Sequence, residues 1–158
     1  MSIKRRFSPR KALRKQIRDE LIQKFGDAVD ELLNGVVEIV EFQDGREVLL
    51  VNGKPVAFKS QDGLFPTLFS ADKIPMKRAV VDMGAVPHVT DGADIMAPGV
   101  VSAAENISPG ECVVVVDERH GKALAIGSAL VESTSMKGPK GRVIKNLHHV
   151  GDDIWKLL

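Results

Sequence analysis

The stretch DGADIMAPGVV (91–101) carries the clearest structural signal in the sequence. Two turns of glycine and small residues, Asp91-Gly92-Ala93 and Pro98-Gly99, bracket the short apolar run Ile95-Met96-Ala97. Such turns suit either a tight sheet corner or the close approach of a ligand to the backbone. The stretch therefore predicts a short strand between turns, with Asp94 as a structural residue that fixes its entrance rather than a catalytic acid.

The residues before this stretch predict a strand followed by a short helix. RAVVD (78–82) is strand-like, and Asp82 is placed to cap the helical segment after it. Gly84-Ala85 leaves backbone N–H groups uncovered near the helix start, a place that attracts phosphate. Gly92 suits the position after the last helical turn, where a positive φ is needed. Pro87 leaves two alternatives, a helix that begins later with Pro87 in its first turn, or a distorted helix.

The residues after the stretch predict further strands. CVVVVDE (112–118) and KALAIGSALV (122–131) are joined by the hairpin turn Arg119-His120-Gly121. A basic connector, SMKGPKGR (135–142), leads to a last strand, RVIKNLHHV (142–150). Many short strands, one short helix and frequent turns indicate a small β-barrel or sandwich.

The N-terminal part predicts helices followed by a meander. SPRKALRKQIRDELIQKF (8–25) reads as an amphipathic helix, with Ser8 as its cap and Pro9 in its first position. DAVDELL (27–33) adds a helical turn. Three strand-like runs then follow, joined at Asp44-Gly45 and Asn52-Gly53: VVEIVEF (36–42), REVLLV (46–51) and PVAFKS (55–60). The expected fold is an α+β N-terminal domain (1–75) followed by a mostly-β domain (76–158).

Composition excludes several classes of protein. The 158 residues are 44% hydrophobic, enough for a real core, and a net charge of +1 gives no global field that names a partner. The one cysteine, Cys112, excludes an internal disulfide and a zinc site built on several cysteines. No secretory signal and no apolar run of about 18 residues appears, so we expect a cytoplasmic protein with no membrane contact.

Signatures of catalysis are absent from the sequence. The glycine-rich loops match neither G-x-G-x-x-G nor G-x-x-x-x-G-K-[ST], and no G-x-S-x-G nucleophile motif occurs. Asp117, Glu118 and His120 are interpreted as turn residues, and Asp152-Asp153 as the cap of the terminal segment. His148 and His149 point to opposite faces of a strand, which is poor geometry for one metal ion. We therefore expect no catalytic residue, metal or cofactor.

Charge and aromatic placement constrain any nucleic-acid contact. Residues 4–18 hold eight cations and no acid before Asp19, and a second basic cluster surrounds KGPKGR (137–142). Such runs suit contact with a polyanion, although a solvated face is the commoner meaning. All six phenylalanines precede residue 70, and the second domain has only Trp155, so it cannot stack successive bases on aromatic rings.

The order of these motifs resembles the PUA domain, an RNA-binding pseudobarrel, over residues 76–158. The resemblance rests on GADIMAPGVV (92–101), the downstream strands and the closing HHVGDDIW (148–155). The basic helix, LLVNGKPVAF (49–58) and FPTL (65–68) are similar to the domain that precedes PUA in the MCT-1/Tma20-like translation-associated family. The resemblance implies a mostly-β PUA-like pseudobarrel and a non-enzymatic RNA-binding protein of translation.

The resemblance also implies where RNA binds and which partners to expect. The implied partners are tRNA or rRNA, the small ribosomal subunit or a translation factor, in initiation or ribosome recycling, with no DNA expected. Two alternatives stay open: a protein-interaction adaptor with little RNA affinity, and an accessory subunit of an RNA-modifying enzyme. The candidate RNA-binding residues are Arg78, Gly84, Ala85, His88, Gly92, Ala93, Asp94, Pro98, Gly99, Lys137, Lys140 and Arg142. Arg10, Lys11, Arg14 and Lys15 are candidates for contact with RNA or the ribosome.

Overall fold

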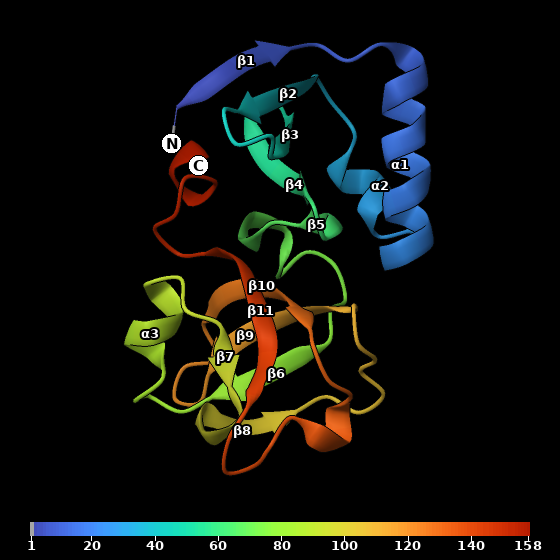
Figure 1. The fold of residues 1–158 in the computed structure, drawn as a ribbon. Helices are drawn as coiled ribbons and strands as arrows, with labels where there is room; N and C mark the ends of the chain where they lie inside the picture. The colour runs from blue at the N-terminus through green and yellow to red at the C-terminus, as the bar shows by residue number, and fades with distance from the viewer. Residues whose placement is uncertain (1) are drawn as a thin grey trace. The chain divides into compact units, whose positions relative to one another are not determined.

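The computed structural model describes residues 2–158 and shows two compact units, each with its own sheet (Figure 1). One unit comprises the residues up to Pro75 together with Lys156–Leu158, and the other comprises Met76–Trp155. Among the residues described, the first sheet has five strands and the second has six. The predicted fold class, an α+β domain followed by a mostly-β pseudobarrel, is confirmed.

The first sheet is an antiparallel meander whose strands neighbour one another in chain order. Its strands are β1 (Ile3–Phe7), β2 (Val37–Phe42), β3 (Glu47–Val51), β4 (Lys54–Ser60) and β5 (Gly63–Pro66). The predicted three-stranded meander is confirmed as its centre, β2 to β4. The edge strands β1 and β5 were not predicted, so the prediction was incomplete at both edges.

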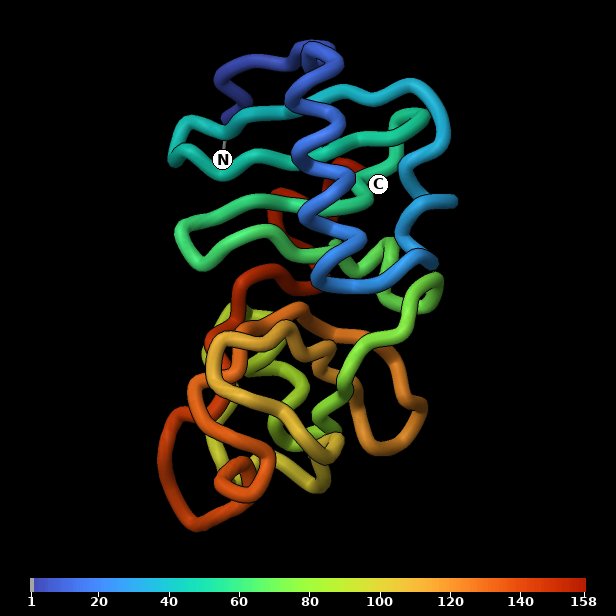
Figure 2. The backbone as a smooth tube through the Cα atoms, turned by 90° about the vertical axis from the view of Figure 1, so that its right-hand side faces the viewer, coloured from blue at the N-terminus to red at the C-terminus, as the bar shows by residue number. Residues whose placement is uncertain are grey.

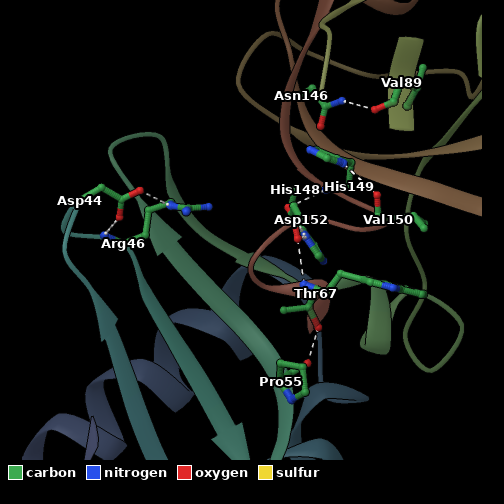
Figure 3. Close-up of polar contacts among 11 residues, drawn as sticks. Asp44, Arg46, Pro55, Thr67, Val89, Asn146, His148, His149, Val150 and Asp152 are labelled. Carbon is green, nitrogen blue, oxygen red and sulfur yellow. Dashed lines mark hydrogen bonds and ion pairs between the residues drawn. The ribbon is translucent and has the colours of Figure 1, made fainter. Parts of the chain in front are cut away.

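Of the two predicted hairpin turns, Asn52-Gly53 has the expected backbone, whereas at Asp44-Gly45 only Gly45 (φ 92°) has a positive φ. Asn52 (φ 51°) and Gly53 (φ 80°) both lie in the left-handed region, as a two-residue hairpin turn requires. In the other turn, the Asp44 carboxylate accepts hydrogen bonds from the backbone N–H of Arg46 (3.0 Å) and from its Nε (2.7 Å) (Figure 3). Local turn chemistry thus sets the register of the central strands.

Strand β1 is held by backbone pairing and charge rather than by a buried face. Its residues are exposed, apart from the half-buried Phe7. Arg5 Nε contacts Glu41 at 2.8 Å, and Arg6 Nη2 contacts Glu38 at 2.8 Å, across the pair with β2. These ion pairs neutralise Arg5 and Arg6, so this part of the N-terminal basic run is a solvated face whose charges are paired.

Helix α1 (Lys11–Phe25) begins later than predicted. Arg10 is its N-cap in an extended conformation, with no side-chain cap, so the prediction that Ser8 caps the helix is wrong. β1 pairs with β2 as far as Phe7, and the chain is still extended at Arg10 (φ −64°, ψ 155°), so the first helical residue is Lys11. The predicted helical turn after α1 is present as α2 (Val29–Leu32). Within residues 2–158 no helix is long and apolar enough to cross a membrane.

The second sheet curls into a nearly closed barrel with the order β7-β11-β10-β9-β6-β8. Its strands are β6 (Arg78–Val81), β7 (Ile95–Met96), β8 (Val100–Ala103), β9 (Cys112–Asp117), β10 (Ala123–Ala129) and β11 (Arg142–His149). Neighbouring strands are antiparallel except β6 and β9, which are parallel. Short helices lie between the strands of the chain: α3 (Val86–Thr90), η2 (Ala97–Gly99) and η3 (Ser133–Ser135).

Aliphatic side chains fill the barrel. Each strand contributes its inward-facing residues, with Val113, Val115 and Ile144 fully buried. Helix α3 closes one side through Val89, which is 2% exposed, and Ala85 and Val86 pack beside it. The position of α3 is therefore fixed by one buried valine and by the turns on either side of the helix.

Candidate nucleic-acid interface

Helix α3 starts at Val86 with Pro87 in its first turn, so the later start is the correct one of the two alternatives. Pro87 fits there because the N–H groups of a first turn have no helical partner. The Asp82 carboxylate accepts a hydrogen bond from the N–H of Ala85 (2.8 Å). Asp82 thus holds the turn that leads into α3, while the helix itself has no side-chain cap.

The end of α3 shows why position 92 holds glycine. Gly92 has φ 95°, its N–H donates to Val89 O (3.0 Å), and the N–H of Ala93 donates to His88 O (3.0 Å). This pair of bonds is the Schellman arrangement, which needs a left-handed residue. A Cβ at Gly92 would also lie 3.1 Å from His149 Nε2. The prediction that Gly92 ends the helix is confirmed.

Asp94 and Asn146 join α3 and β7 to β11. The Asp94 carboxylate accepts from Arg142 Nη1 (3.0 Å) and from the N–H of Asn146 (2.8 Å). The Asn146 amide in turn donates to Val89 O (3.0 Å) (Figure 3) and to Ala93 O (2.9 Å). These bonds support the interpretation of Asp94 as a structural residue. Asn146 was missed, since a single asparagine inside a strand pattern gives no sequence signal.

Backbone hydrogen bonds bring three separate segments into one surface. The N–H of Asp82 donates to Gly99 O (2.9 Å), and the N–H of Ala97 donates to Gly141 O (2.8 Å). The turn before α3, the η2 turn and the start of β11 therefore lie side by side. We call this the α3 surface: the exposed or half-exposed groups of 82–94, 96–99 and 137–142. It contains every candidate RNA-binding residue of the second unit except Arg78.

The glycines of the α3 surface have different roles. A Cβ at Gly99 would lie 3.1 Å from the Cβ of Ala85, so Gly99 is bare to let η2 pack against the turn before α3. Gly84 is exposed, has no positive φ, and a Cβ there would meet nothing closer than 3.4 Å. Neither backbone strain nor packing explains glycine at position 84.

The α3 surface carries charges of both signs, since Asp82, Asp91 and Asp94 lie on it together with its cations. Lys137 and Lys140 are exposed and, within residues 2–158, have no ion pair. The Arg142 side chain is 60% exposed although it pairs with Asp94, and His88 is exposed on α3. Arg78 is not brought to this surface. It lies at the opposite end of β6 from Asp82, four residues or about 13 Å of extended chain away.

The β9–β10 hairpin brings to the α3 surface two cations that were not predicted from the sequence. The buried Asp117 carboxylate accepts hydrogen bonds from the N–H groups of His120 (2.6 Å), Arg119 (2.9 Å) and Lys122 (3.1 Å). The bond from His120 is the largest of the effects that lower the Asp117 pKa. The N–H of Glu118 donates to Val81 O (3.0 Å), which places this hairpin beside the turn before α3. Arg119 and Lys122 are thus exposed beside the α3 surface.

His148 and Asp152 of the second unit are structural partners of each other. His148 is 1% exposed, and its Nδ1 lies 2.9 Å from the carboxylate of Asp152, which also accepts from the N–H of Trp155 (2.8 Å) (Figure 3). The predicted cap at Asp152 is therefore confirmed. Across residues 2–158 no group of three or more histidine, cysteine, aspartate or glutamate side chains could hold a metal ion.

The basic residues of α1 belong to the other unit. Arg10, Lys11 and Arg14 are exposed, and none has an ion pair with any residue in the 2–158 range. Lys15 pairs with Asp19 at 3.3 Å on the same helix. Unlike Arg5 and Arg6, the first three cations of α1 are not neutralised by neighbours.

Comparison with family models identifies the class of protein that the fold and the α3 surface define. Residues 77–151 match the PUA domain, and residues 6–73 match a domain of unknown function, DUF1947. A hypothetical protein of Pyrococcus horikoshii has the same architecture at a TM-score of 0.80 and 37% identity, covering 97% of this chain and 99% of that chain. This chain is thus a PUA-domain protein with a DUF1947 domain before it.

Full-length relatives define the family. An uncharacterized protein of Methanocaldococcus jannaschii is 44% identical over 98% of both chains. Translation machinery-associated protein 20 of Saccharomyces cerevisiae is 34% identical over 84% of this chain and 79% of that protein. Malignant T-cell-amplified sequence 1-B of Xenopus laevis is 31% identical over 90% of this chain and 86% of that protein. The chain belongs to the MCT-1/Tma20-like family that these relatives represent. The resemblance seen in the sequence is confirmed.

Proposed function

We propose that this chain is a non-enzymatic RNA-binding protein of translation, and that its second unit binds structured RNA through the α3 surface. The PUA match and the name of the yeast relative, translation machinery-associated protein 20, support this role. The proposed RNA is tRNA or small-subunit rRNA, and the proposed setting is initiation or ribosome recycling in the cytoplasm.

One observation carries the proposal for the site: Gly84 is exposed, and neither a positive φ nor close packing accounts for the absence of a side chain there. The neighbouring surface is formed by residues with small side chains or none, so a sugar-phosphate backbone can approach it closely. These residues are Ala85, Gly92, Ala93, Pro98 and Gly99. Lys137, Lys140 and Arg142, and in addition Arg119 and Lys122, would contact phosphates. Such contacts position an RNA without reading its sequence.

Substitution of Gly84 tests the site without disturbing the fold. We expect Gly84→Leu to weaken binding of bulk tRNA or small-subunit rRNA at least tenfold, because the leucine occupies the space that the phosphate backbone needs. The thermal midpoint should stay within a few degrees. Gln61→Leu, an equally exposed position in the first unit, is the control and should change RNA affinity less than twofold. Fluorescence anisotropy at low salt gives both affinities.

The outcomes separate this proposal from its two alternatives. If the wild-type protein binds neither RNA at low salt, the adaptor function takes its place. If Gly84→Leu binds RNA as well as wild type, RNA binding lies elsewhere on the molecule. Base modification of bulk tRNA by the purified protein would overturn the non-enzymatic assignment.

The cations at the start of α1 are proposed as a second contact, with RNA or with the ribosome. Arg10, Lys11 and Arg14 have no ion pair within residues 2–158, which supports a role beyond solvation. Reversal of these three charges and of Lys15 should reduce co-sedimentation with ribosomes. Unchanged co-sedimentation would mean that the helix is only a solvated face.

A further inference from the structure

Helix α1 leaves an open groove against the sheet of the first unit. Only Leu21 on α1 is buried, while Ile17 is half-buried and Leu13 is 37% exposed. Figure 2 shows α1 crossing in front of the strands of this sheet. On one side of the helix lies a cavity of about 370 Å³, a size typical of ligand-binding pockets. The N-terminal half of α1 therefore packs incompletely.

One rim of the groove is a stripe of cations on α1. Lys11, Arg14, Lys15 and Arg18 are spaced i, i+3, i+4 and i+7, so they share one helix face over about 10 Å. Among the described residues, none that lines the groove has a carboxylate. Lys15 pairs with Asp19 at 3.3 Å and Arg18 with Asp30 at 2.8 Å, but within residues 2–158 Lys11 and Arg14 have no ion pair. The rim is complementary to negative charge.

The floor of the groove is aliphatic. Ile17, Leu33, Val37 and Leu49 line it, and no aromatic ring is among the lining residues. Proteins that hold unpaired bases stack them on aromatic rings or on guanidinium planes, so this floor is poorly suited to a base. A phosphate gains nothing from an aliphatic floor. A leucine, isoleucine or valine side chain gains from burial there.

The other flank of α1 differs in both size and charge. It forms a cleft of about 60 Å³, which Glu20 and Glu47 line together with Lys59. Cations and open apolar space therefore coincide on one side of the helix only. A merely solvated basic helix would not require this segregation.

We propose that the groove binds an acidic peptide segment of a partner protein, one that places an aliphatic side chain between two or more carboxylates. Binding of this kind lays an amphipathic segment along a groove, with apolar anchors inside and charges at the rim. The inference rests on the proposed function in one respect, that α1 contacts a partner in translation. It names a protein rather than RNA as that partner, and it does not depend on the α3 surface.

A synthetic probe tests the inference on the full chain. The probe is a fluorescein-labelled 12-residue peptide of glutamates with leucine at every third or fourth position, measured by anisotropy at low salt. We expect Lys11→Glu/Arg14→Glu to raise its dissociation constant at least tenfold. For a matched comparison, Lys11→Glu alone should weaken binding at least threefold. Lys59→Glu, an exposed lysine of the same unit on the other flank of α1, should change it less than twofold.

The remaining arms decide between occupants. A peptide with serine in place of leucine should bind at least fivefold more weakly. Binding of bulk tRNA by the α1 variants decides whether α1 contacts a protein or RNA: unchanged tRNA affinity is expected for a peptide groove, and lost tRNA affinity would assign these cations to RNA. Gly84→Leu should keep peptide affinity while losing tRNA, so failure of the groove and failure of the α3 surface are distinguishable. Three results would each overturn the inference: no binding of the leucine peptide, equal binding of the serine peptide, or loss of tRNA binding in Lys11→Glu/Arg14→Glu.

Discussion

Asp94 and Asn146 are two short polar side chains that fix a helix too short to be stable by itself. An isolated helix of five residues does not form in water, so α3 depends on its surroundings. Val89 supplies the buried contact, and the four hydrogen bonds of Asp94 and Asn146 join the ends of α3 and β7 to β11. The geometry of the α3 surface thus depends on this polar pair.

Removing the Asp94 carboxylate should cost stability. In Asp94→Ala the part-buried N–H of Asn146 loses its acceptor, so we expect the free energy of unfolding to fall by about 1–3 kcal/mol. Urea denaturation measures this change. Asp91→Ala, at an exposed neighbouring position, should stay within about 0.5 kcal/mol of wild type. Equal stability of the two variants would mean that Asp94 does not fix the fold.

Asp152 predicts a stability that depends on acid pH. Burial by itself would raise the Asp152 pKa, but the His148 imidazole and the N–H groups of Trp155 and His149 together lower it below its usual value. The ionised carboxylate therefore contributes stability above the unfolded pKa of about 3.9, and this is lost as pH falls through the lowered folded value. Asp152→Asn should have a lower urea midpoint than wild type at pH 7. The difference between the two midpoints should be smaller at pH 3. A gap independent of pH would exclude this charge effect.

Among the elements, β1 decides where α1 begins. Pairing of β1 with β2 keeps the chain extended as far as Phe7, and Pro9 is buried while Ser8 is exposed. The ideal capping sequence Ser8-Pro9 is therefore outside the helix. Tertiary pairing overrides a local signal that would otherwise start α1 two residues earlier.

This difference can be measured at Ser8. A serine that caps a helix costs about 1 kcal/mol when it is replaced by alanine. Because Ser8 makes no cap here, Ser8→Ala should change the free energy of unfolding by less than about 0.5 kcal/mol. Urea denaturation decides, and a loss of 1 kcal/mol or more would mean that α1 starts at Ser8 in solution.

The sequence predicted the elements whose cause is local and missed those whose cause is distant. Asn52-Gly53 and Gly92 demand particular turns, so the central hairpins and the end of α3 followed from the sequence. β1 has no buried face, and its strand conformation comes from backbone pairing with β2, supported by ion pairs with Glu38 and Glu41. β5 was missed because it is short, is apolar without alternation and ends in Pro66, which is unusual in a strand except at an edge.

In the candidate site, too, the features with a local cause were predicted and those with a distant cause were missed. Motif spacing identified the turns of the α3 surface, but their contact depends on hydrogen bonds between residues far apart, such as Ala97 to Gly141. Arg78 was grouped with α3 because it is near in sequence, and the length of β6 separates the two. Arg119 and Lys122 were missed because only the barrel brings their hairpin beside Val81.

At the scale of the whole molecule, charge is local rather than global. A net charge of +1 provides little long-range attraction for a polyanion. Many cations are already paired, as Arg5, Arg6 and Arg18 show. The groups left without ion pairs within residues 2–158 lie in small sets, among them Lys137 with Lys140. RNA affinity should therefore depend on few phosphate contacts, and its salt dependence should be correspondingly shallow.

The salt dependence of tRNA binding counts those contacts. Each phosphate contact contributes about 0.7–0.9 to the slope of log affinity against log salt. Lys137→Gln/Lys140→Gln should reduce the magnitude of that slope by about 1.5, because two contacts are removed. Lys59→Gln serves as control and should leave the slope unchanged. A double variant with weaker binding but the wild-type slope would mean that the two lysines do not contact phosphates.

The contrast between Gly92 and Gly84 has a consequence for evolution. The positive φ and the His149 ring, 3.1 Å from where a Cβ would lie, disfavour a side chain at position 92, whereas position 84 can hold one. Descendants that abandon RNA but keep the barrel should retain glycine at 92 and drift at 84. The residue at position 84 would then indicate whether a relative still binds RNA, and the residue at position 92 whether it keeps the fold.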